Sequence, residues 1–289
     1  MVAVSTIDLH CHSNASDGQL PPAAVVELAA QAGVKVLALT DHDTTAGLDA
    51  AAEEAQRHGM QLVAGVEIST VWQRREFHVL GLGVDQHAPA LQQGLRWNQD
   101  RRRQRILAMA ERLESRADVA GAVAHVEGLR QAQPGRLHLA RYLVEAGRVR
   151  TIQQAFDRYL KRGRPAYRGV DWMNLETAAA LIRQAGGVAV LAHPLAYGLT
   201  GAWMRRVLGA FREAGGAGVE VVVGGADRRR VEQALGYALR TGLEGSIGSD
   251  FHGPGPVLST PGRLSPLPRA VEPVWRRLRD VGGEPLPAC

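Results

Sequence analysis

Apolar, β-branched runs alternate with amphipathic helical stretches along most of the chain, and this alternation limits the fold more than any other feature. Seven runs predict strands, at Val2–Leu9, Lys35–Leu39, Gln61–Ile68, Phe77–Val84, Gly187–Ala192, Gly218–Val223 and Glu244–Gly248. Helices are predicted between several of them, at Pro21–Ala32, Thr45–His58, Leu175–Gln184, Ala202–Ala214 and Arg228–Arg240. Strands that alternate with helices predict parallel pairing. Because no GxGxxG follows the first strand, we favour an α/β barrel over a dinucleotide-binding fold.

The alternation stops between about Leu95 and Arg168, where only helical patterns are found. They cover Gln92–Ser115, Asp118–Gly128, Leu137–Glu145 and Ile152–Leu160. We interpret this stretch as a helical insertion into the alternating domain. The predicted organisation is a barrel formed by residues 1–94 and 169–289, and a basic helical insertion, residues 95–168, that caps the substrate. A last short helix is predicted near Val271–Asp280.

Charge is divided unevenly between these two parts. The 289 residues contain 34 Lys and Arg against 29 Asp and Glu, a formal net charge of +5. The predicted insertion holds 17 basic and 7 acidic residues, a net of +10, so the remainder carries −5. The only lysines are Lys35 and Lys161, and arginine pairs well with phosphate through its planar fork. We therefore expect a small anionic substrate beside the insertion.

Several functional classes are excluded because their motifs are absent. No run of about 18 apolar residues occurs, so we expect neither a membrane span nor a membrane partner. The first residues lack the basic and apolar regions of a secretory signal, and Cys11 and Cys289 cannot form a disulfide framework. A cytoplasmic location is therefore expected. Neither a GxSxG elbow nor a GxxxxGK[ST] loop occurs, and no obligate protein partner is indicated.

Histidines and carboxylates gather where the predicted strands end. His10 and His12 stand two residues apart, so both imidazoles point to one face of the first strand and Cys11 points to the other. Asp250 and His252 form a second such pair after the last strand. The remaining candidates are Asp17, His42, Glu67, His78 and His193. In parallel α/β barrels, active sites are built at this rim.

These nine side chains predict a site for two or three metal ions. A single histidine at a strand end is usually solvated or hydrogen-bonded, but two such pairs with further candidates on other strands favour metal binding. His78 is the weakest candidate because it stands at the start of its predicted strand. Asp8, Asp41 and Asp43 have two interpretations: each orients a ligating imidazole, or each holds a loop.

Four motifs of the chain resemble those of the polymerase and histidinol phosphatase (PHP) family. They are Asp8-Leu9-His10-Cys11-His12 with Asp17-Gly18, Thr40-Asp41-His42-Asp43, Ala192-His193-Pro194, and Gly248-Ser249-Asp250-Phe251-His252. Glu67 and His78 fall where that family has its bridging glutamate and a further histidine. The resemblance covers most of the chain outside the insertion, and it implies a distorted (β/α)7 barrel.

The resemblance also implies a trinuclear metal site. One ion would be held by His10, His12, Glu67 and Asp250. Glu67 would bridge to a second ion, which His78 and His193 also hold, and a third ion would lie among Asp17, His42 and His252. Manganese is the metal that the family implies, while the donor types also allow Zn²⁺, Fe²⁺ or Mg²⁺.

Within the family, the chain is similar to the 3′,5′-nucleotide bisphosphate phosphatases. The supporting segments are Gly135-Arg136-Leu137-His138-Leu139-Ala140-Arg141 and Tyr159-Leu160-Lys161-Arg162-Gly163-Arg164-Pro165-Ala166-Tyr167. The resemblance implies removal of the 3′-phosphate from adenosine 3′,5′-bisphosphate (pAp), and some members also degrade short RNA from its 5′ end. We expect a metal-bridging hydroxide to attack phosphorus, with His193 and Asp250 as catalytic residues. The expected contacts of the second phosphate are Arg136, His138, Arg141 and Lys161.

Two alternative functions stay open. A histidinol-phosphate phosphatase would share the chemistry, but its cationic substrate fits poorly beside a basic insertion. A non-catalytic, polymerase-accessory nucleic-acid-binding module is the other alternative, and the complete ligand set counts against it. Outside the predicted site, Arg101–Arg103 and Arg228–Arg230 are expected to face solvent, and Gly224-Gly225 is expected to form a plain turn.

Overall fold

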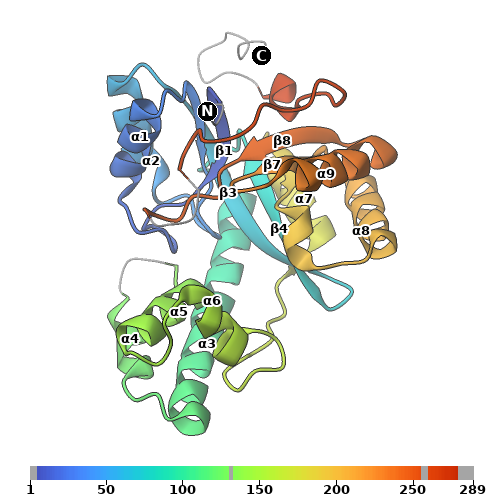
Figure 1. Cartoon of the computed structure of the whole chain (residues 1–289). Helices are drawn as coiled ribbons and strands as arrows, with labels where there is room; N and C mark the ends of the chain where they lie inside the picture. The colour runs from blue at the N-terminus through green and yellow to red at the C-terminus, as the bar shows by residue number, and fades with distance from the viewer. Residues whose placement is uncertain (1–4, 130–132, 255–259, 279–289) are drawn as a thin grey trace.

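The structure is a computed structural model that describes residues 5–129, 133–254 and 260–278. A strongly twisted sheet forms a nearly closed barrel, and a group of helices projects from one end of it (Figure 1). The strands of these residues are β1 (Ile7–Cys11), β2 (Val36–Leu39), β3 (Gln61–Trp72), β4 (Arg75–Leu82), β5 (Met173–Asn174), β6 (Val188–Leu191), β7 (Gly218–Val223) and β8 (Glu244–Gly248). They are ordered β1-β2-β3-β4-β6-β7-β8, with the short β5 beside β3. The predicted distorted barrel is confirmed.

The two ends of the sheet meet just beyond β8. The backbone N–H of Asp250 donates to the carbonyl of His10 at 2.8 Å, and that of His12 donates to the carbonyl of Phe251 at 2.9 Å. Cys11 and Phe251 form a parallel bridge. The barrel therefore closes at the rim where the predicted metal ligands gather.

One part of the sheet departs from the predicted parallel pairing. β3 and β4 form an antiparallel hairpin through Gln73 and Arg74, whose φ angles are 46° and 62°. β4 is also antiparallel to β6. The prediction was wrong here because a two-residue turn with positive φ reverses the chain directly, without an intervening helix. As a result, the first half of β4 lies at the same rim as the carboxyl ends of the parallel strands.

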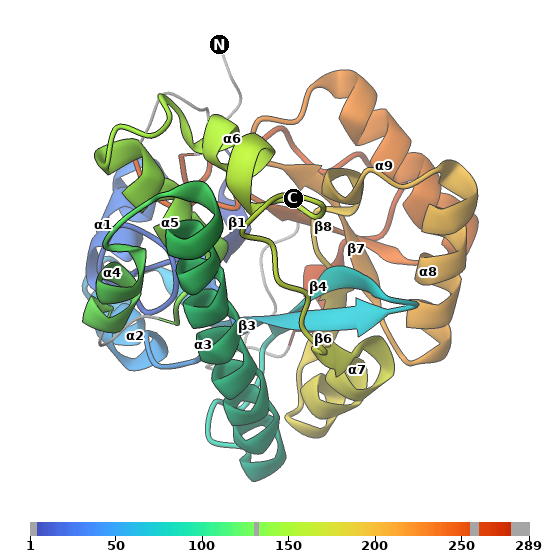
Figure 2. The same ribbon diagram turned by 90° about the horizontal axis from the view of Figure 1, so that it is seen from below.

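Five helices surround the barrel close to their predicted positions. They are α1 (Pro22–Gln31), α2 (Leu48–Arg57), α7 (Leu175–Gln184), α8 (Gly201–Glu213) and α9 (Arg228–Thr241). Figure 2 shows α1 and α2 on one side of the barrel and α8 and α9 on the other. Asn174, Thr200 and Asp227 precede the last three helices, and each side chain accepts a hydrogen bond from a first-turn N–H. These caps explain where the helices begin.

Two predicted ends differ from the structure. β1 begins at Ile7 and ends at Cys11, so His10 lies inside the strand instead of after it. Residues 1–4, which the prediction included, lie outside the described residues. The helix predicted near the end is a short 3₁₀ turn, η3 (Val274–Arg277), and residues 279–280 also lie outside the described part.

The predicted insertion is helical and has its own core. Its elements are α3 (Pro89–Ala117), α4 (Ala122–Gly128), α5 (Arg136–Glu145), α6 (Ile152–Ala155) and a π-helix, η1 (Phe156–Leu160). The first turns of α3 bury Leu91 and Leu95 in the barrel core. Further along, Met109 and Leu113 pack in a separate cluster with Leu139 of α5. This separate core supports a division near residues 95 and 168, although the boundaries stay a prediction.

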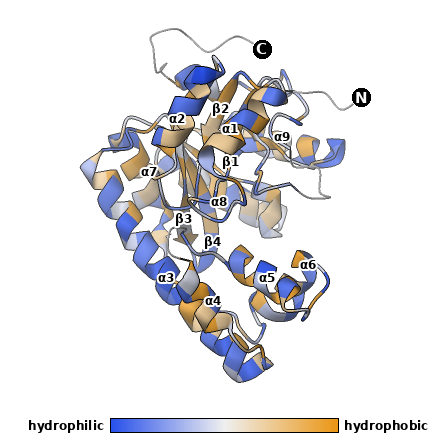
Figure 3. Ribbon diagram, turned by 90° about the vertical axis from the view of Figure 1, so that its left-hand side faces the viewer, coloured by the Kyte–Doolittle hydropathy of each residue, from blue (hydrophilic) through white to orange (hydrophobic). Residues whose placement is uncertain are grey.

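The residues of α3 are largely hydrophilic, as Figure 3 shows. This agrees with the run of arginines along the helix. Within the described residues, not even this 29-residue helix combines the length and apolar character that crossing a bilayer requires.

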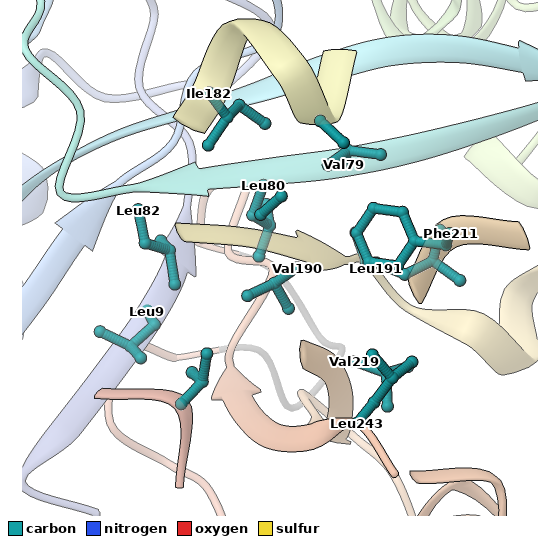
Figure 4. Close-up of a cluster of buried hydrophobic side chains, with 14 of the residues drawn as sticks. Leu9, Val79, Leu80, Leu82, Ile182, Val190, Leu191, Phe211, Val219 and Leu243 are labelled. Atoms are coloured by element: carbon teal, nitrogen blue, oxygen red, sulfur yellow. The ribbon is translucent and has the colours of Figure 1, made fainter. Parts of the chain in front are cut away.

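The barrel core is formed by side chains from strands and surrounding helices (Figure 4). Leu80 of β4 and Leu191 of β6 are fully buried, as are Ile182 of α7 and Phe211 of α8. Burying each such side chain stabilises the fold by about 1.5–3 kcal/mol. This packing supplies the rigid support on which the rim residues stand.

Candidate metal centre

Glu67, near the middle of β3, lies at the centre of a polar cluster and is fully buried. Its Oε1 is 3.0 Å from Nδ1 of His78 and 2.9 Å from Nε2 of His193. Its Oε2 is 2.9 Å from Nδ1 of His42 and 3.2 Å from Nε2 of His12. One carboxylate thus contacts imidazoles from four segments of the chain, as a bridging ligand would.

The pairs His10 with His12 and Asp250 with His252 lie beside this carboxylate. Nε2 of His10 is 3.0 Å from Nε2 of His12. Oδ1 of Asp250 is 3.3 Å from the first of these atoms and 3.4 Å from the second. Asp17 joins the cluster through His252, with 3.2 Å between Oδ1 and Nε2. The structure therefore brings together all nine residues that we predict to bind metal.

His78 reaches the cluster because of the antiparallel hairpin. It pairs with Ser69 in the ladder between β3 and β4. Since β4 runs against its neighbours, a residue near its beginning lies where the parallel strands end. The reason for treating His78 as the weakest candidate, its position early in a strand, is thereby removed.

Three overlapping groups of ligand atoms are compact enough to share ions, with all atoms of a group within 4.8 Å of one another. The groups are His12, Asp17, His42 and His252; His10, His12 and Glu67; and His42, Glu67 and His78. Each group differs by one residue from the ligand set that the resemblance implies. The first adds His12 to Asp17, His42 and His252, and the second lacks Asp250. The third has His42 where the resemblance implies His193. Because residues are shared between groups, the number of ions stays a prediction.

Several buried polar atoms of the cluster form no well-oriented hydrogen bond among the described residues, although some lie within contact distance of one another. They are His12 Nδ1, Asp17 Oδ1, His42 Nδ1, Glu67 Oε2 and His193 Nδ1. An unsatisfied buried polar atom costs about 1–3 kcal/mol. Divalent cations would satisfy imidazole nitrogens and carboxylate oxygens together. The residues therefore fit a metal centre.

Burial and neighbouring charges set the protonation states of the cluster. Burial raises the pKa of Glu67, but the imidazoles of His42 and His78 outweigh it and hold that pKa well below its usual range. Burial lowers the pKa of His42 to about 4. For His252, burial is outweighed by Asp17, which raises the pKa to about 9. Glu67 and His42 are thus in the forms that bind cations, whereas His252 must release a proton first.

Glu220 of β7 was missed by the sequence reasoning. This fully buried residue has Oε1 2.9 Å from Nδ1 of His10, and its Oε2 accepts the backbone N–H of His193 at 2.5 Å. A carboxylate behind a ligating imidazole fixes the orientation of the ring. The signal was a single glutamate inside the apolar strand Gly218–Val223.

The hydrogen bonds of Asp8, Asp41 and Asp43 favour the interpretation in which each carboxylate holds a loop. Asp8 accepts the backbone N–H groups of Ser249 and Gly262 at 2.8 and 2.9 Å. Asp41 accepts hydrogen bonds from the loop residues Ser13 and Ser16. Asp43 accepts hydrogen bonds from Ser69 of β3 and from Asn98 and Arg102 of α3. The described hydrogen bonds therefore favour the loop-holding interpretation, because backbone N–H, hydroxyl, amide and guanidinium donors occupy these oxygens.

A cavity of about 190 Å³ separates the metal cluster from the helical group. The cluster side is lined by Asp17, His42, His78 and His252. The opposite side is lined by Arg102, Arg105 and Arg136, with the aromatic rings of Phe156 and Trp172. An anion bound here would contact the cluster and face arginine at the same time.

Two of the four predicted phosphate contacts are engaged with the protein backbone. Nδ1 of His138 accepts the N–H of Gly135 at 3.1 Å at the start of α5. Arg141 donates to the carbonyls of Asp17 and His252 at 2.8 and 3.3 Å. Arg141 therefore fastens α5 to two segments of the metal cluster.

The other two predicted contacts differ in their access to the cavity. Arg136 lines it, with its side chain 31% exposed and 3.8 Å from Glu76. Lys161 is exposed, pairs with Asp157 at 2.5 Å and does not line this cavity. Lys161 follows the end of η1 and its side chain is directed to Asp157, so the structure does not bring it to the others.

The expectation for Arg101–Arg103 was wrong at Arg102. That side chain is buried, and its Nε and Nη2 atoms donate to Oδ2 of Asp43 at 3.0 and 2.5 Å. Helical spacing places Arg102 on the same face as Asn98 and Arg105, toward the barrel. The arginines of 228–230 are exposed, as expected.

Comparison with known proteins agrees with this geometry. A family model of the PHP domain matches residues 8–166. A protein of Haemophilus influenzae named 5′-3′ exoribonuclease is 40% identical over 93% of this chain and 98% of its own length. A protein of Chromobacterium violaceum named 3′,5′-nucleoside bisphosphate phosphatase is 39% identical over 95% of this chain and 97% of its own length.

A solved structure also resembles the chain over most of its length. It comes from Chromobacterium violaceum, is described as an amidohydrolase with bound sulfate and no metal, and is 39% identical with a TM-score of 0.90. The likeness covers 95% of this chain and 96% of the other. The family model spans more than half of the chain, and relatives of nearly full length share about two-fifths of its residues. The chain therefore belongs to the PHP domain family.

Proposed function

We propose that this chain is a metal-dependent phosphomonoesterase that removes the 3′-phosphate from 3′,5′-bisphosphonucleotides and so converts pAp to AMP. The observation that carries the proposal is the cavity in which the metal cluster faces Arg136. Such an arrangement accommodates one phosphate at the cluster and a second at the arginine. The relatives named as a nucleoside bisphosphate phosphatase and as an exoribonuclease support it.

The nine clustered side chains would hold two or three ions, with Glu67 between them. Bound divalent cations would neutralise phosphoryl oxygens and lower the pKa of the attacking water. Manganese is the metal we propose, and Zn²⁺, Fe²⁺ and Mg²⁺ are alternatives that the same donors accept. We place the activity in the cytoplasm, where a free thiol such as that of the buried Cys11 persists.

We assign the protein's part in proton transfer to His193 and Asp250. The imidazole of His193 is 14% exposed beside the cluster, and we propose that it gives the leaving 3′ oxygen its proton. The side chain of Asp250 is 29% exposed, whereas that of Glu67 is fully buried. Asp250 is therefore a carboxylate of the cluster that a substrate can reach.

Arg136 is the residue we propose to bind the 5′-phosphate. Its guanidinium is partly exposed in the cavity and lies 3.8 Å from Glu76, with no hydrogen bond to it among the described residues, so its donors can pair bidentately with phosphate oxygens. Arg102 and Arg105 line the same cavity, but their donors are engaged by Asp43 and Glu76. They contribute positive charge to the cavity, while the direct contact is left to Arg136.

A comparison of substrates tests the proposal. The manganese-loaded protein is expected to hydrolyse pAp with a kcat/KM well above that for histidinol phosphate, because the latter is cationic and lacks a second phosphate. A reversed preference would establish the histidinol-phosphate alternative. No turnover of any phosphoester by protein that binds manganese would leave the accessory-module alternative.

A further inference from the structure

A second cavity, of about 160 Å³, borders the metal cluster between β7 and α9. Its polar lining includes His193 and Asp250 from the cluster, Glu220 from behind His10, and Arg230 from the first turn of α9. The remainder is mainly apolar and includes Leu195, Val223 and Ala234. The cavity thus combines predicted metal ligands, an apolar wall and one arginine.

The two cavities lie on different sides of the cluster. Among the described residues they share no lining residue: the first takes Asp17, His42, His78 and His252, and the second takes His193, Glu220 and Asp250. The partition between them is thin, because Oε1 of Glu67 contacts both His78 and His193 at about 3 Å. A phosphate held at the cluster can therefore carry a substituent on either side.

Arg230 and Arg228 both lie in the first turn of α9, but only Arg228 forms an ion pair among the described residues. Arg228 is paired with Glu232 at 2.8 Å. Arg230 is exposed, lines the second cavity and has no ion pair with the described residues. The plain turn expected at Gly224-Gly225 also lines this cavity, so the backbone there leaves space for a ligand.

Hydrolysis of pAp does not require the second cavity. Water adds its oxygen to phosphorus, the O3′–P bond breaks, and the 3′ oxygen takes a proton, which leaves AMP and inorganic phosphate. In a 5′-phosphorylated RNA, the same O3′–P bond follows the first nucleotide, but phosphorus also carries the O5′ of the next one. Breaking it with water releases a nucleoside 5′-monophosphate and an RNA with a new 5′-phosphate. The only added requirement is space for the next nucleotide beyond the scissile phosphate.

We infer that the second cavity receives the nucleotide that follows the scissile phosphate, and that Arg230 pairs with the phosphate after it. The apolar wall accommodates the base and ribose. This inference rests on the proposed function. The exoribonuclease activity for which a relative is named is not new; what we add is the place of the following nucleotide and the role of Arg230. The first cavity then holds the nucleotide to be released, as it holds the nucleoside part of pAp.

The test compares pAp with the 5′-phosphorylated trinucleotide pApApA on manganese-loaded protein. The ratio of kcat/KM for pApApA to kcat/KM for pAp is expected to fall about five- to tenfold in Arg230→Ala, the scale of one charge-assisted contact. Ala226→Trp, which fills the cavity from its rim, is expected to lower the same ratio at least as much. Arg229→Ala removes the same charge from a neighbouring exposed position that does not line the cavity, and should leave the ratio unchanged.

A binding measurement provides a readout that does not depend on turnover. On metal-stripped protein, the affinity for fluorescently labelled pApApA is expected to depend on salt, and Arg230→Ala should reduce the slope by about 0.7. If pAp is hydrolysed while both the ratio and the slope are unchanged in Arg230→Ala and Ala226→Trp, the inference is overturned and the proposed function stands. If wild-type protein hydrolyses pAp but not pApApA, the inference also fails. If neither is hydrolysed, the proposed function itself fails.

Discussion

The carboxylate of Glu220 stands behind His10, with 2.9 Å between Oε1 and Nδ1, so that Nε2 of the imidazole points into the metal cluster. The same carboxylate receives the backbone N–H of His193. One buried side chain of β7 therefore positions two predicted ligands, one inside β1 and one just after β6. Its role is to orient them and to increase the basicity of the imidazole.

Glu220→Gln is expected to lower manganese affinity about 10- to 100-fold, as the loss of such a carboxylate does in other metal sites. The amide keeps the shape but removes the negative charge from Nδ1 of His10. Affinity can be measured by competition with a chelator of known strength. Glu244→Gln is the matched control, because Glu244 begins β8 and pairs with Arg277 outside the cluster. Equal affinities in the two variants would contradict the role given to Glu220.

Arg102→Ala is expected to destabilise the protein by about 3–5 kcal/mol, because it leaves the buried carboxylate of Asp43 without its cation. The ion pair also fastens α3 to the barrel. Chemical denaturation should show the lower free energy of unfolding. Arg103→Ala, next to it on the exposed face, should change stability by no more than about 0.5 kcal/mol. A similar small change in both would mean that Asp43 is stabilised by its other hydrogen bonds.

The metal cluster was largely predictable because its signals are local. The members of each pair, His10 with His12 and Asp250 with His252, are two residues apart at a strand end. Because side chains alternate between the two faces of a strand, both members of a pair are expected on one face. Predicting the whole barrel parallel failed because the turn at Gln73 gives only a weak signal.

Two other features depended on packing between distant segments. Glu220 contacts a residue 210 positions away, and an isolated glutamate in an apolar strand does not identify its partner. Arg102 was recoverable in principle, because Leu91, Leu95, Asn98 and Arg102 recur every three or four residues on one helical face. The charged run around Arg102 concealed that period.

Stability is expected to fall as the pH is lowered through about 6.5, in part because of His138. Burial lowers the pKa of this imidazole in the folded protein, whereas in the unfolded chain it is about 6.5. Its contribution is therefore complete above the unfolded pKa and is lost as the pH falls toward the folded one. Protonation would also remove Nδ1 as the acceptor of the Gly135 N–H.

His138→Gln separates this effect from that of the other histidines. The glutamine carbonyl can accept the same N–H at this helix position but does not titrate. Between pH 7.5 and 5.5, metal-free wild type should lose more stability than the variant, by up to about 1 kcal/mol, the scale of one helix cap. Thermal unfolding at the two pH values measures the difference. Parallel losses would exclude His138 as a source of the pH dependence.

Arg136→Ala is expected to raise KM for pAp about 10- to 100-fold, but to change KM for 3′-AMP little, because only the former presents a 5′-phosphate to this side chain. Arg141→Ala should affect both substrates alike, since Arg141 supports the carbonyls of Asp17 and His252. Lys161→Ala is the charge-matched control, as that side chain pairs with Asp157 away from the cavity. Initial-rate measurements give KM for pAp and for 3′-AMP in each variant. An equal rise in KM on both for Arg136→Ala, or a selective rise for Lys161→Ala, would show that the 5′-phosphate lies elsewhere.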